Sequence, residues 1–232
     1  MLEHATDRFP SPDELASRLG LLDDRLRELS GGRTAMLPVT KAFGVDAVRA
    51  VLATGRTEVG ENYAQELLGK HLDLAAEKES EAEGTVPSAR WHMIGGVQRN
   101  KVRRLAGIVS LWQTVDRVDL VDELARRTPG ARILVQVDPA GTPGKGGCPP
   151  ADVEGLVLRA VDGGLEVAGL MTVGVIGDAE ATGAAFRVVA RLADDLGLVE
   201  RSMGMSGDLE SAIEHGSTMV RIGRALFGDR PC

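Results

Sequence analysis

An α/β fold, a single (β/α)8 TIM-type barrel of alternating parallel strands and helices, is what the sequence predicts. Eight short runs of β-branched or continuously apolar residues recur along the 232 residues, at 35–40, 57–60, 90–95, 108–115, 133–137, 167–173, 201–205 and 218–222. Helical stretches separate these runs, and such alternation is typical of a parallel sheet. The runs show no period of two, which indicates strands that are covered on both faces. Eight units in one domain-sized chain favour a closed barrel over an open sheet.

An extra N-terminal helix is expected at about 11–30. The sequence S-P-D-E at its start has the spacing of a capping box, and a leucine at every third or fourth position gives it one apolar face. Only residues 223–232 follow the last predicted strand, so this helix can cover the place of a full eighth helix. We therefore predict one domain over 1–232, with the barrel proper at about 34–228 and no second β-domain. Residues 78–88, charged and rich in small side chains, predict an exposed loop.

Composition and charge argue against several classes of protein. The formal net charge is −7, which disfavours a general nucleic-acid or membrane binder, and the basic residues from Arg99 to Arg104 are expected to form a solvated helix face. No apolar run approaches a membrane span, and residues 1–9 lack the core of a signal peptide. Cys148 and Cys232 lack metal-ligand spacing, and Cys148 is expected to be an exposed loop thiol. These features predict a reduced, cytoplasmic protein.

Functional residues of such barrels lie at the carboxyl ends of the strands. Lys41 follows the first predicted strand, and Glu61 and Asn62 follow the second. A lysine at this place could belong to a structural ion pair, or it could be a nucleophile that forms a Schiff base. His92 lies within the third strand and is expected to be a hydrogen-bonded core or rim histidine.

The ends of the last two strands have the composition of a phosphate site. Ser206 and Gly207 follow the seventh strand, and Gly223 follows the eighth. A hydroxyl group and unpaired backbone amides suit a phosphate dianion, although Ser206 could instead cap the helix after it. A lysine opposite a phosphate site fits a phosphorylated aldehyde held as an imine. Arg221, near the same mouth, could supply the positive field that lowers the pKa of such a lysine.

Six motifs occur in an order that resembles one protein family. They read M-L-P-V-T-K, G-E-N-Y-A-Q-E, W-H-M-I-G-G-V-Q-R-N-K, G-L-M-T-V-G, S-M-G-M-S-G-D and V-R-I-G-R-A-L-F-G. Together, from about residue 35 to 228, they resemble the pyridoxal 5′-phosphate homeostasis protein family. The resemblance implies an alanine-racemase-like barrel with pyridoxal 5′-phosphate as its cofactor. The loop at 140–147 departs from the family's usual S-G-E-x-S-K-x-G, so no role is assigned to its Lys145.

The resemblance also implies which residues bind the cofactor. Lys41 would carry it as an internal aldimine, Asn62 would line its face, and Arg221 would contact the pyridine nitrogen. The phosphate would be held by Ser206, Gly223 and Arg224. No catalytic residue and no metal ligand is predicted.

A cofactor carrier without strong catalysis is the function that this resemblance favours. Racemases of this barrel type use a second base, a tyrosine from an added β-domain of a partner subunit, whereas the only tyrosine here, Tyr63, is expected to pack at a helix start. We therefore expect a monomer that buffers pyridoxal phosphate or delivers it to pyridoxal phosphate-dependent apo-enzymes. The alternatives are a racemase-like enzyme that uses pyridoxal phosphate and an aldolase that uses Lys41 without a cofactor.

Overall fold

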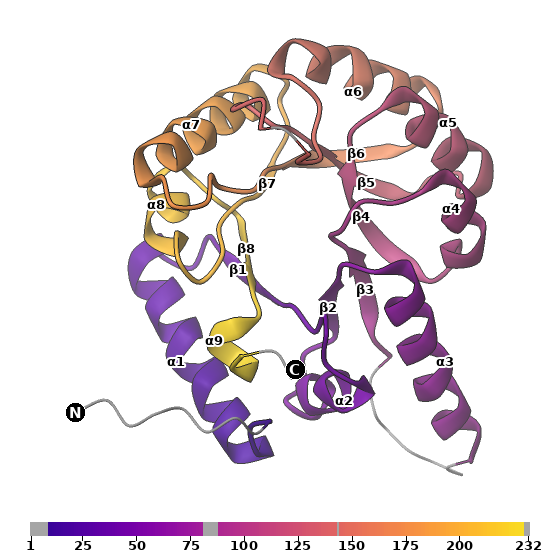
Figure 1. The fold of residues 1–232 in the computed structure, drawn as a ribbon, viewed down its shortest axis with the longest axis vertical. Coiled ribbons are helices and arrows are strands. Elements are labelled where there is room, and N and C mark those ends of the chain that lie inside the picture. The colour runs from indigo at the N-terminus through magenta and orange to yellow at the C-terminus, as the bar shows by residue number, and fades with distance from the viewer. Residues whose placement is uncertain (1–8, 81–87, 143, 230–232) are drawn as a thin grey trace.

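The computed structural model describes residues 9–80, 88–142 and 144–229, and these form the predicted barrel (Figure 1). The strands are β1 (Ala35–Pro38), β2 (Glu58–Glu61), β3 (Arg90–Met93), β4 (Val109–Val115), β5 (Arg132–Gln136), β6 (Glu166–Met171), β7 (Glu200–Ser202) and β8 (Met219–Ile222). All are parallel, in the order β1-β8-β7-β6-β5-β4-β3-β2. The ring is nearly closed, because Val39 and Gly60 form a bridge where β1 and β2 meet, and Thr40 N donates to Gly60 O at 3.1 Å.

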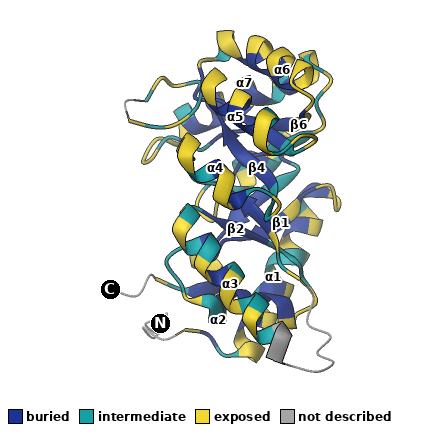
Figure 2. Cartoon of the chain, turned by 90° about the vertical axis from the view of Figure 1, so that its right-hand side faces the viewer, coloured by how far each residue is buried: buried dark blue, intermediate teal, exposed yellow. Residues whose placement is uncertain are grey.

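Helices surround the strands on the outside (Figure 1). They are α1 (Pro12–Ser30), α2 (Val45–Ala53), α3 (Ala64–Ser80), α4 (Arg99–Leu105), α5 (Val118–Arg127), α6 (Val153–Asp162), α7 (Ala179–Asp195), α8 (Leu209–Glu214) and α9 (Arg224–Phe227). Figure 2 shows buried strands at the centre and exposed residues on the outer faces of the helices. This pattern agrees with the absence of a period of two in the strand sequences, since both faces of each strand are covered. In the described ranges, no helix is both long and apolar enough to span a membrane.

The N-terminal helix α1 forms as its sequence predicts. Ser11 is its N-cap in a capping box with Glu14, and Gly31 ends it with a left-handed backbone, φ 61°. Its leucine face packs inward, and the helix contacts α2, α8 and α9. The Arg18 guanidinium donates to the carbonyl of Leu226 in α9 at 2.7 Å. The helix therefore covers the side of the barrel where α8 and α9 are too short to do so.

Several sequence expectations were wrong in detail. Strand β1 ends at Pro38 and β7 at Ser202, earlier than predicted, although single backbone contacts continue beyond both ends: Val39 forms a bridge with Gly60, and Met203 N donates to Met219 O at 3.1 Å. The expected loop at 78–88 begins with the last turn of α3, and 81–87 lie outside the described residues. Cys148 is buried rather than exposed, since its segment folds back to form a bridge with Val137, and burial raises the pKa of its thiol to about 12.

Candidate functional site

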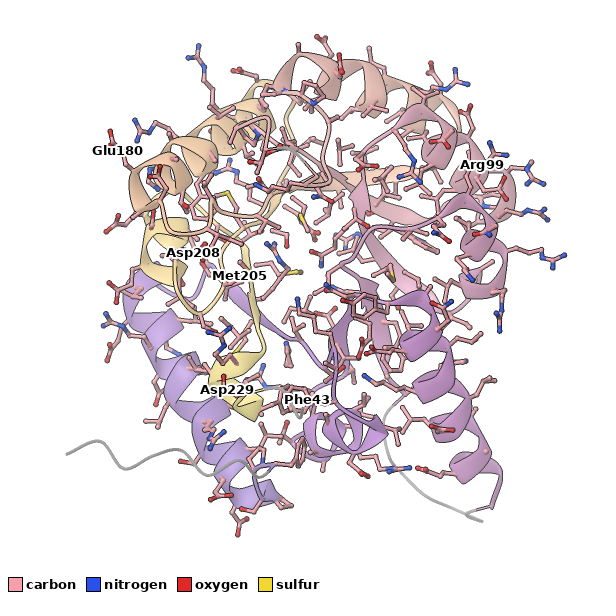
Figure 3. All side chains as sticks on the ribbon, viewed as in Figure 1. Phe43, Arg99, Glu180, Met205, Asp208 and Asp229 are labelled. Atoms are coloured by element: carbon pink, nitrogen blue, oxygen red, sulfur yellow. The ribbon has the colours of Figure 1, made fainter. Side chains whose placement is uncertain are left out.

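A cavity of about 670 Å³ opens at the carboxyl ends of the strands. All six residues proposed from the sequence to bind a cofactor line it: Lys41, Asn62, Ser206, Arg221, Gly223 and Arg224. They come from the ends of β1, β2, β7 and β8, far apart in the sequence. Figure 3 shows Phe43, Met205 and Asp229 around the same mouth, whereas Arg99 and Glu180 lie on outer helices. The structure thus brings together every residue of the predicted set.

Arg221 forms the buried polar end of this cavity. Its guanidinium donates to the carbonyl of Thr172 at 2.7 Å, and to the carbonyl and hydroxyl oxygens of Ser202 at 2.7 Å each. Burial lowers the pKa of Arg221 to about 10, and the Asp208 carboxylate opposes this shift. The pKa still lies above neutral pH, so the side chain stays cationic and can act only as a donor.

A chain of buried polar side chains continues from Arg221 into the barrel. The Ser202 hydroxyl donates to Gln113 Oε1 at 2.6 Å, and Gln113 Nε2 lies 3.0 Å from His92 Nδ1. His92 Nε2 in turn lies 3.7 Å from Glu58 Oε1, and His92 lowers the pKa of Glu58. His92 is therefore the hydrogen-bonded core histidine expected from the sequence. The chain fixes Ser202, and through Ser202 the orientation of Arg221.

The turn after β7 presents Ser206 to the cavity. Asp208 Oδ1 accepts a hydrogen bond from Met205 N at 2.5 Å, and Asp208 N donates to Met205 O at 3.2 Å. Asp208, not Ser206, is the N-cap residue of α8. The alternative that Ser206 serves as the helix cap is therefore wrong, and Ser206 lines the cavity.

Gly223 lies directly opposite the end of β1. Its carbonyl accepts from Leu226 N and Phe227 N, at 3.0 Å each, and so begins α9. A Cβ atom at this position would lie 3.2 Å from the carbonyl oxygen of Val39. The close approach keeps the backbone of Gly223 at the cavity wall. The side chain of the next residue, Arg224, is exposed, and its Nε lies 3.7 Å from Asp229 Oδ1.

The backbone around Lys41 is held by residues from the next strand and helix. Glu61, buried at 0% exposure, accepts from Thr40 Oγ1 at 2.6 Å and from Lys70 Nζ at 2.5 Å. Burial raises the pKa of Glu61, while the Lys70 ammonium opposes the shift. Glu66 accepts from the amide of Ala42 at 3.0 Å. Sequence reasoning gave no role to Glu66 or Lys70, although the motif G-E-N-Y-A-Q-E contains the first of them.

Asn62 is placed by Gly95. A Cβ atom on Gly95 would lie 2.1 Å from the backbone oxygen of Asn62, a distance that no real side chain could keep. The neighbouring Gly96 has open space around a built Cβ. Only glycine therefore allows the end of β3 to approach the segment that carries Asn62 into the cavity.

We expect Gly95→Ala to destabilise the protein, because the added methyl group must push the backbone of Asn62 away. Overpacking of this kind costs about 1–3 kcal/mol of the free energy of unfolding. Urea unfolding followed by circular dichroism measures the loss, and Gly96→Ala is the matched control that should unfold within about 0.5 kcal/mol of the wild type. A Gly95→Ala protein as stable as Gly96→Ala would contradict this packing argument.

Two polar residues after strands β4 and β5 serve a loop rather than the cavity. Asp116 Oδ2 accepts from Gly147 N at 3.1 Å, and Asp138 Oδ2 accepts from Thr142 N at 2.6 Å. Lys145, in the same loop, donates to the carbonyl of Val173 at 2.6 Å and lies 3.3 Å from Asp138. The described residues contain no cluster of His, Cys, Asp and Glu side chains suited to a metal ion.

Comparison with known proteins places this barrel and its site in a class. The family model for the alanine racemase N-terminal domain matches residues 23–231. The chain is 37% identical over 230 residues to the pyridoxal phosphate homeostasis protein of Pseudomonas aeruginosa, covering 93% of this chain and 96% of that protein. It is 35% identical over 226 residues to the Bos taurus protein of the same name, covering 89% and 81%. The chain belongs to the pyridoxal phosphate homeostasis protein family.

A solved structure agrees with this assignment. PipY of Synechococcus elongatus, solved with pyridoxal phosphate bound, superposes with a TM-score of 0.77 at 28% identity, over 92% of this chain and 100% of that one. The barrel fold is thus shared along nearly the whole length of both chains.

The residues of the cavity fit pyridoxal phosphate by the chemistry of their groups. Lys41 supplies an amine for an aldehyde, and Arg221 supplies a donor for an unprotonated pyridine nitrogen. Ser206 supplies a hydroxyl group. Gly223 contributes backbone to the cavity wall, at a position where a Cβ atom would lie 3.2 Å from Val39 O. Residues with an amine, a guanidinium and a hydroxyl group, Lys41, Arg221 and Ser206, therefore line one cavity from the ends of different strands.

Proposed function

We propose that this protein binds pyridoxal 5′-phosphate covalently through Lys41 and serves in pyridoxal phosphate homeostasis as a cofactor carrier. The observation that carries the proposal is the convergence of Lys41, Ser206 and Arg221 on one cavity of about 670 Å³. The names of its relatives, and the pyridoxal phosphate bound to PipY, support it. When bound, the cofactor supplies an aldehyde: the Lys41 amine forms a C=N bond to its carbon, and the aldehyde oxygen leaves as water.

The other groups orient the cofactor. Ser206, Gly223 and Arg224 would hold the phosphate, and the exposed position of Arg224 suits a screened charge contact at the mouth. Asn62 would lie against the ring. Arg221 would donate to the pyridine nitrogen and leave it unprotonated, because its pKa of about 10 exceeds neutral pH. An unprotonated ring is a weaker sink for the electrons of a carbanion.

A carrier, rather than an enzyme, is the function we infer from the proton-transfer groups. Racemisation needs a base on each face of the substrate carbon, and one positioned base contributes roughly 10²–10⁴-fold. Lys41 could serve one face. The only tyrosine in the chain, Tyr63, precedes α3 with 55% exposure, and it does not belong to the cavity lining. Its expected packing role is wrong, since more than half of the side chain is exposed to solvent.

We further propose the setting in which the carrier acts. The protein would work in the cytoplasm as a monomer, buffering free pyridoxal phosphate or passing it to apo-enzymes that require it. The proposed exchange suits a site in a cavity that opens at the carboxyl ends of the strands.

The proposed function is tested by turnover. We expect the protein loaded with pyridoxal phosphate to exchange the Cα proton of L-alanine in D₂O no faster than a generic protein lysine–pyridoxal phosphate adduct. Proton NMR and chiral analysis of the product measure both exchange and racemisation. Multiple turnovers per second that vanish in Lys41→Ala would overturn the carrier proposal and favour a racemase. A visible spectrum that does not change when pyridoxal phosphate is added would favour the cofactor-free aldolase.

A further inference from the structure

The residue after Lys41 has a strained backbone. Ala42 has φ 66°, and among the described residues it is the single non-glycine residue with positive φ. A side chain in this left-handed region clashes with its own backbone, so such residues persist only where the surroundings hold them. Such residues gather at functional sites. The contacts that hold Ala42 therefore also bear on how the neighbouring Lys41 is placed.

Glu66 holds the peptide group on the carboxyl side of Lys41. Its Oε2 accepts from the amide of Ala42 at 3.0 Å, from the first turn of α3. This hydrogen bond fixes the peptide between Lys41 and Ala42, the one whose rotation would relieve the positive φ. A charged acceptor makes a stronger hydrogen bond than a neutral one, so it can balance part of the strain.

Lys70 holds the peptide group on the other side of Lys41. Its Nζ donates to the carbonyl of Thr40 at 2.9 Å and to Glu61 at 2.5 Å, and Glu61 also accepts from the Thr40 hydroxyl. Thr40 and Glu61 are fully buried, and Lys70 is 6% exposed. Burying the Glu61–Lys70 ion pair costs desolvation free energy, which is offset only by good hydrogen-bond geometry. Its position beside the carbonyl of Thr40 therefore points to a role in holding this peptide group.

The two contacts belong to one assembly. Lys70 and Glu66 are one turn apart on α3, with Lys70 Nζ 3.7 Å from Glu66 Oε2. Helix α3 therefore reaches both peptide groups that flank Lys41. The turn at Ala42 directs the chain out of β1 and along the cavity, which Lys41 and Phe43 both line.

We propose that Glu66 and Lys70, with Lys70 fixed by Glu61, are positioning residues that hold the Lys41 backbone so that its amine meets the cofactor's aldehyde. The inference rests on the proposed function and deepens it. These residues touch the peptide groups of residues 40–42 and act on the cofactor only through Lys41. They account for the two glutamates of the G-E-N-Y-A-Q-E segment and for Lys70, four positions after it, to which the sequence analysis assigned no role in the site.

The test compares two quantities: the rate at which Lys41 captures pyridoxal phosphate covalently, and the affinity for a ligand that cannot form this bond. In Glu66→Ala, we expect the visible absorbance change on mixing with pyridoxal phosphate to form roughly ten- to a hundredfold more slowly, as the loss of support for one strained residue predicts. Binding of pyridoxine 5′-phosphate, which has the ring and phosphate but no aldehyde, should not change. The control is Glu77→Ala, since Glu77 lies on the same helix and pairs with Arg49 instead.

Rescue separates positioning from a general structural role. Glycine adopts positive φ without strain, so adding Ala42→Gly to Glu66→Ala should restore the wild-type rate of capture. For the buried pair, Glu61→Leu with Lys70→Met replaces both charges by apolar groups of similar size, a change that often preserves stability. We expect this double variant to melt near the wild-type temperature and to capture pyridoxal phosphate more slowly.

The outcomes distinguish this inference from the proposed function. If the wild type shows no covalent capture, the proposed function fails. If the wild type captures the cofactor while Glu66→Ala and the folded double variant do so at its rate, positioning by α3 is refuted. A Glu66→Ala protein that is slow, yet not restored by Ala42→Gly, would also refute it.

Discussion

Lys41→Ala is expected to abolish covalent capture of pyridoxal phosphate. The variant should show no visible band beyond that of the free aldehyde, and borohydride should leave no stable adduct, because Lys41 is the one lysine among the described residues that line the cavity. Ser206, Arg221 and Gly223 are unchanged in this variant, so weaker non-covalent binding of the cofactor should remain. Absorbance spectra, and the mass of the protein before and after borohydride reduction, measure the two effects separately.

Mapping the adduct in the wild type makes the assignment specific. Borohydride reduces the C=N bond to a stable secondary amine, so peptide mass mapping locates the lysine that carried the cofactor. We expect the modified peptide to contain Lys41, and we expect Lys101→Ala, a change on the outer helix α4, to leave the adduct in place. An adduct found only on Lys101 or Lys145 would show that the amine was assigned wrongly.

The sequence predicts this site well because the position of a residue along a barrel strand determines the end of the barrel at which it lies. Lys41, Asn62 and Arg221 each follow or end a short apolar run, and parallel strands place all such ends at one mouth. The prediction needs only the approximate ends of the strands, so the early ends of β1 at Pro38 and β7 at Ser202 do not disturb it.

Contacts between side chains distant in the sequence could not be predicted in the same way. Thr40 and Glu61 are 21 positions apart, and Gln113 and Ser202 are 89 apart. Periodicity and strand ends say which face a residue lies on, but not which rotamer it adopts or which partner it meets. The positive φ of Ala42 was likewise invisible, because glycine or asparagine usually marks such a position.

Local chemistry also misled the prediction in two places. A cysteine in a Gly/Pro-rich segment was expected to be exposed, yet the amide of Cys148 donates to Gln136 O at 2.9 Å and its carbonyl accepts from Asp138 N at 2.9 Å. This pairing beside β5 buries the thiol. Tyr63 is apolar enough to suggest packing, but it lies at a helix start that faces solvent.

Changing a residue at the phosphate end of the cavity is expected to affect the binding of pyridoxal phosphate and of pyridoxal, which share a ring, to different extents. Ser206→Ala should weaken binding of pyridoxal phosphate by about 1.5–3 kcal/mol, because it removes a hydrogen bond to a charged group. This corresponds to roughly ten- to more than a hundredfold in the dissociation constant. Pyridoxal, which lacks the phosphate, should bind almost unchanged. Fluorescence or absorbance titrations of both ligands measure the difference, with Ser211→Ala on α8 as the matched control.

Gly223→Glu should have the larger effect at the same end. Its Cβ atom would approach Val39 O at 3.2 Å, and its carboxylate would repel the phosphate dianion across a partly enclosed cavity. Gly223→Gln adds nearly the same bulk without the charge, so the difference between the two variants isolates the repulsion. We expect the affinity for pyridoxal phosphate to fall far more in Gly223→Glu than in Gly223→Gln. The difference in affinity between the two variants should decrease as salt screens the charges. Equal losses for pyridoxal phosphate and pyridoxal in both variants would mean that Gly223 and Ser206 shape the cavity without binding a phosphate.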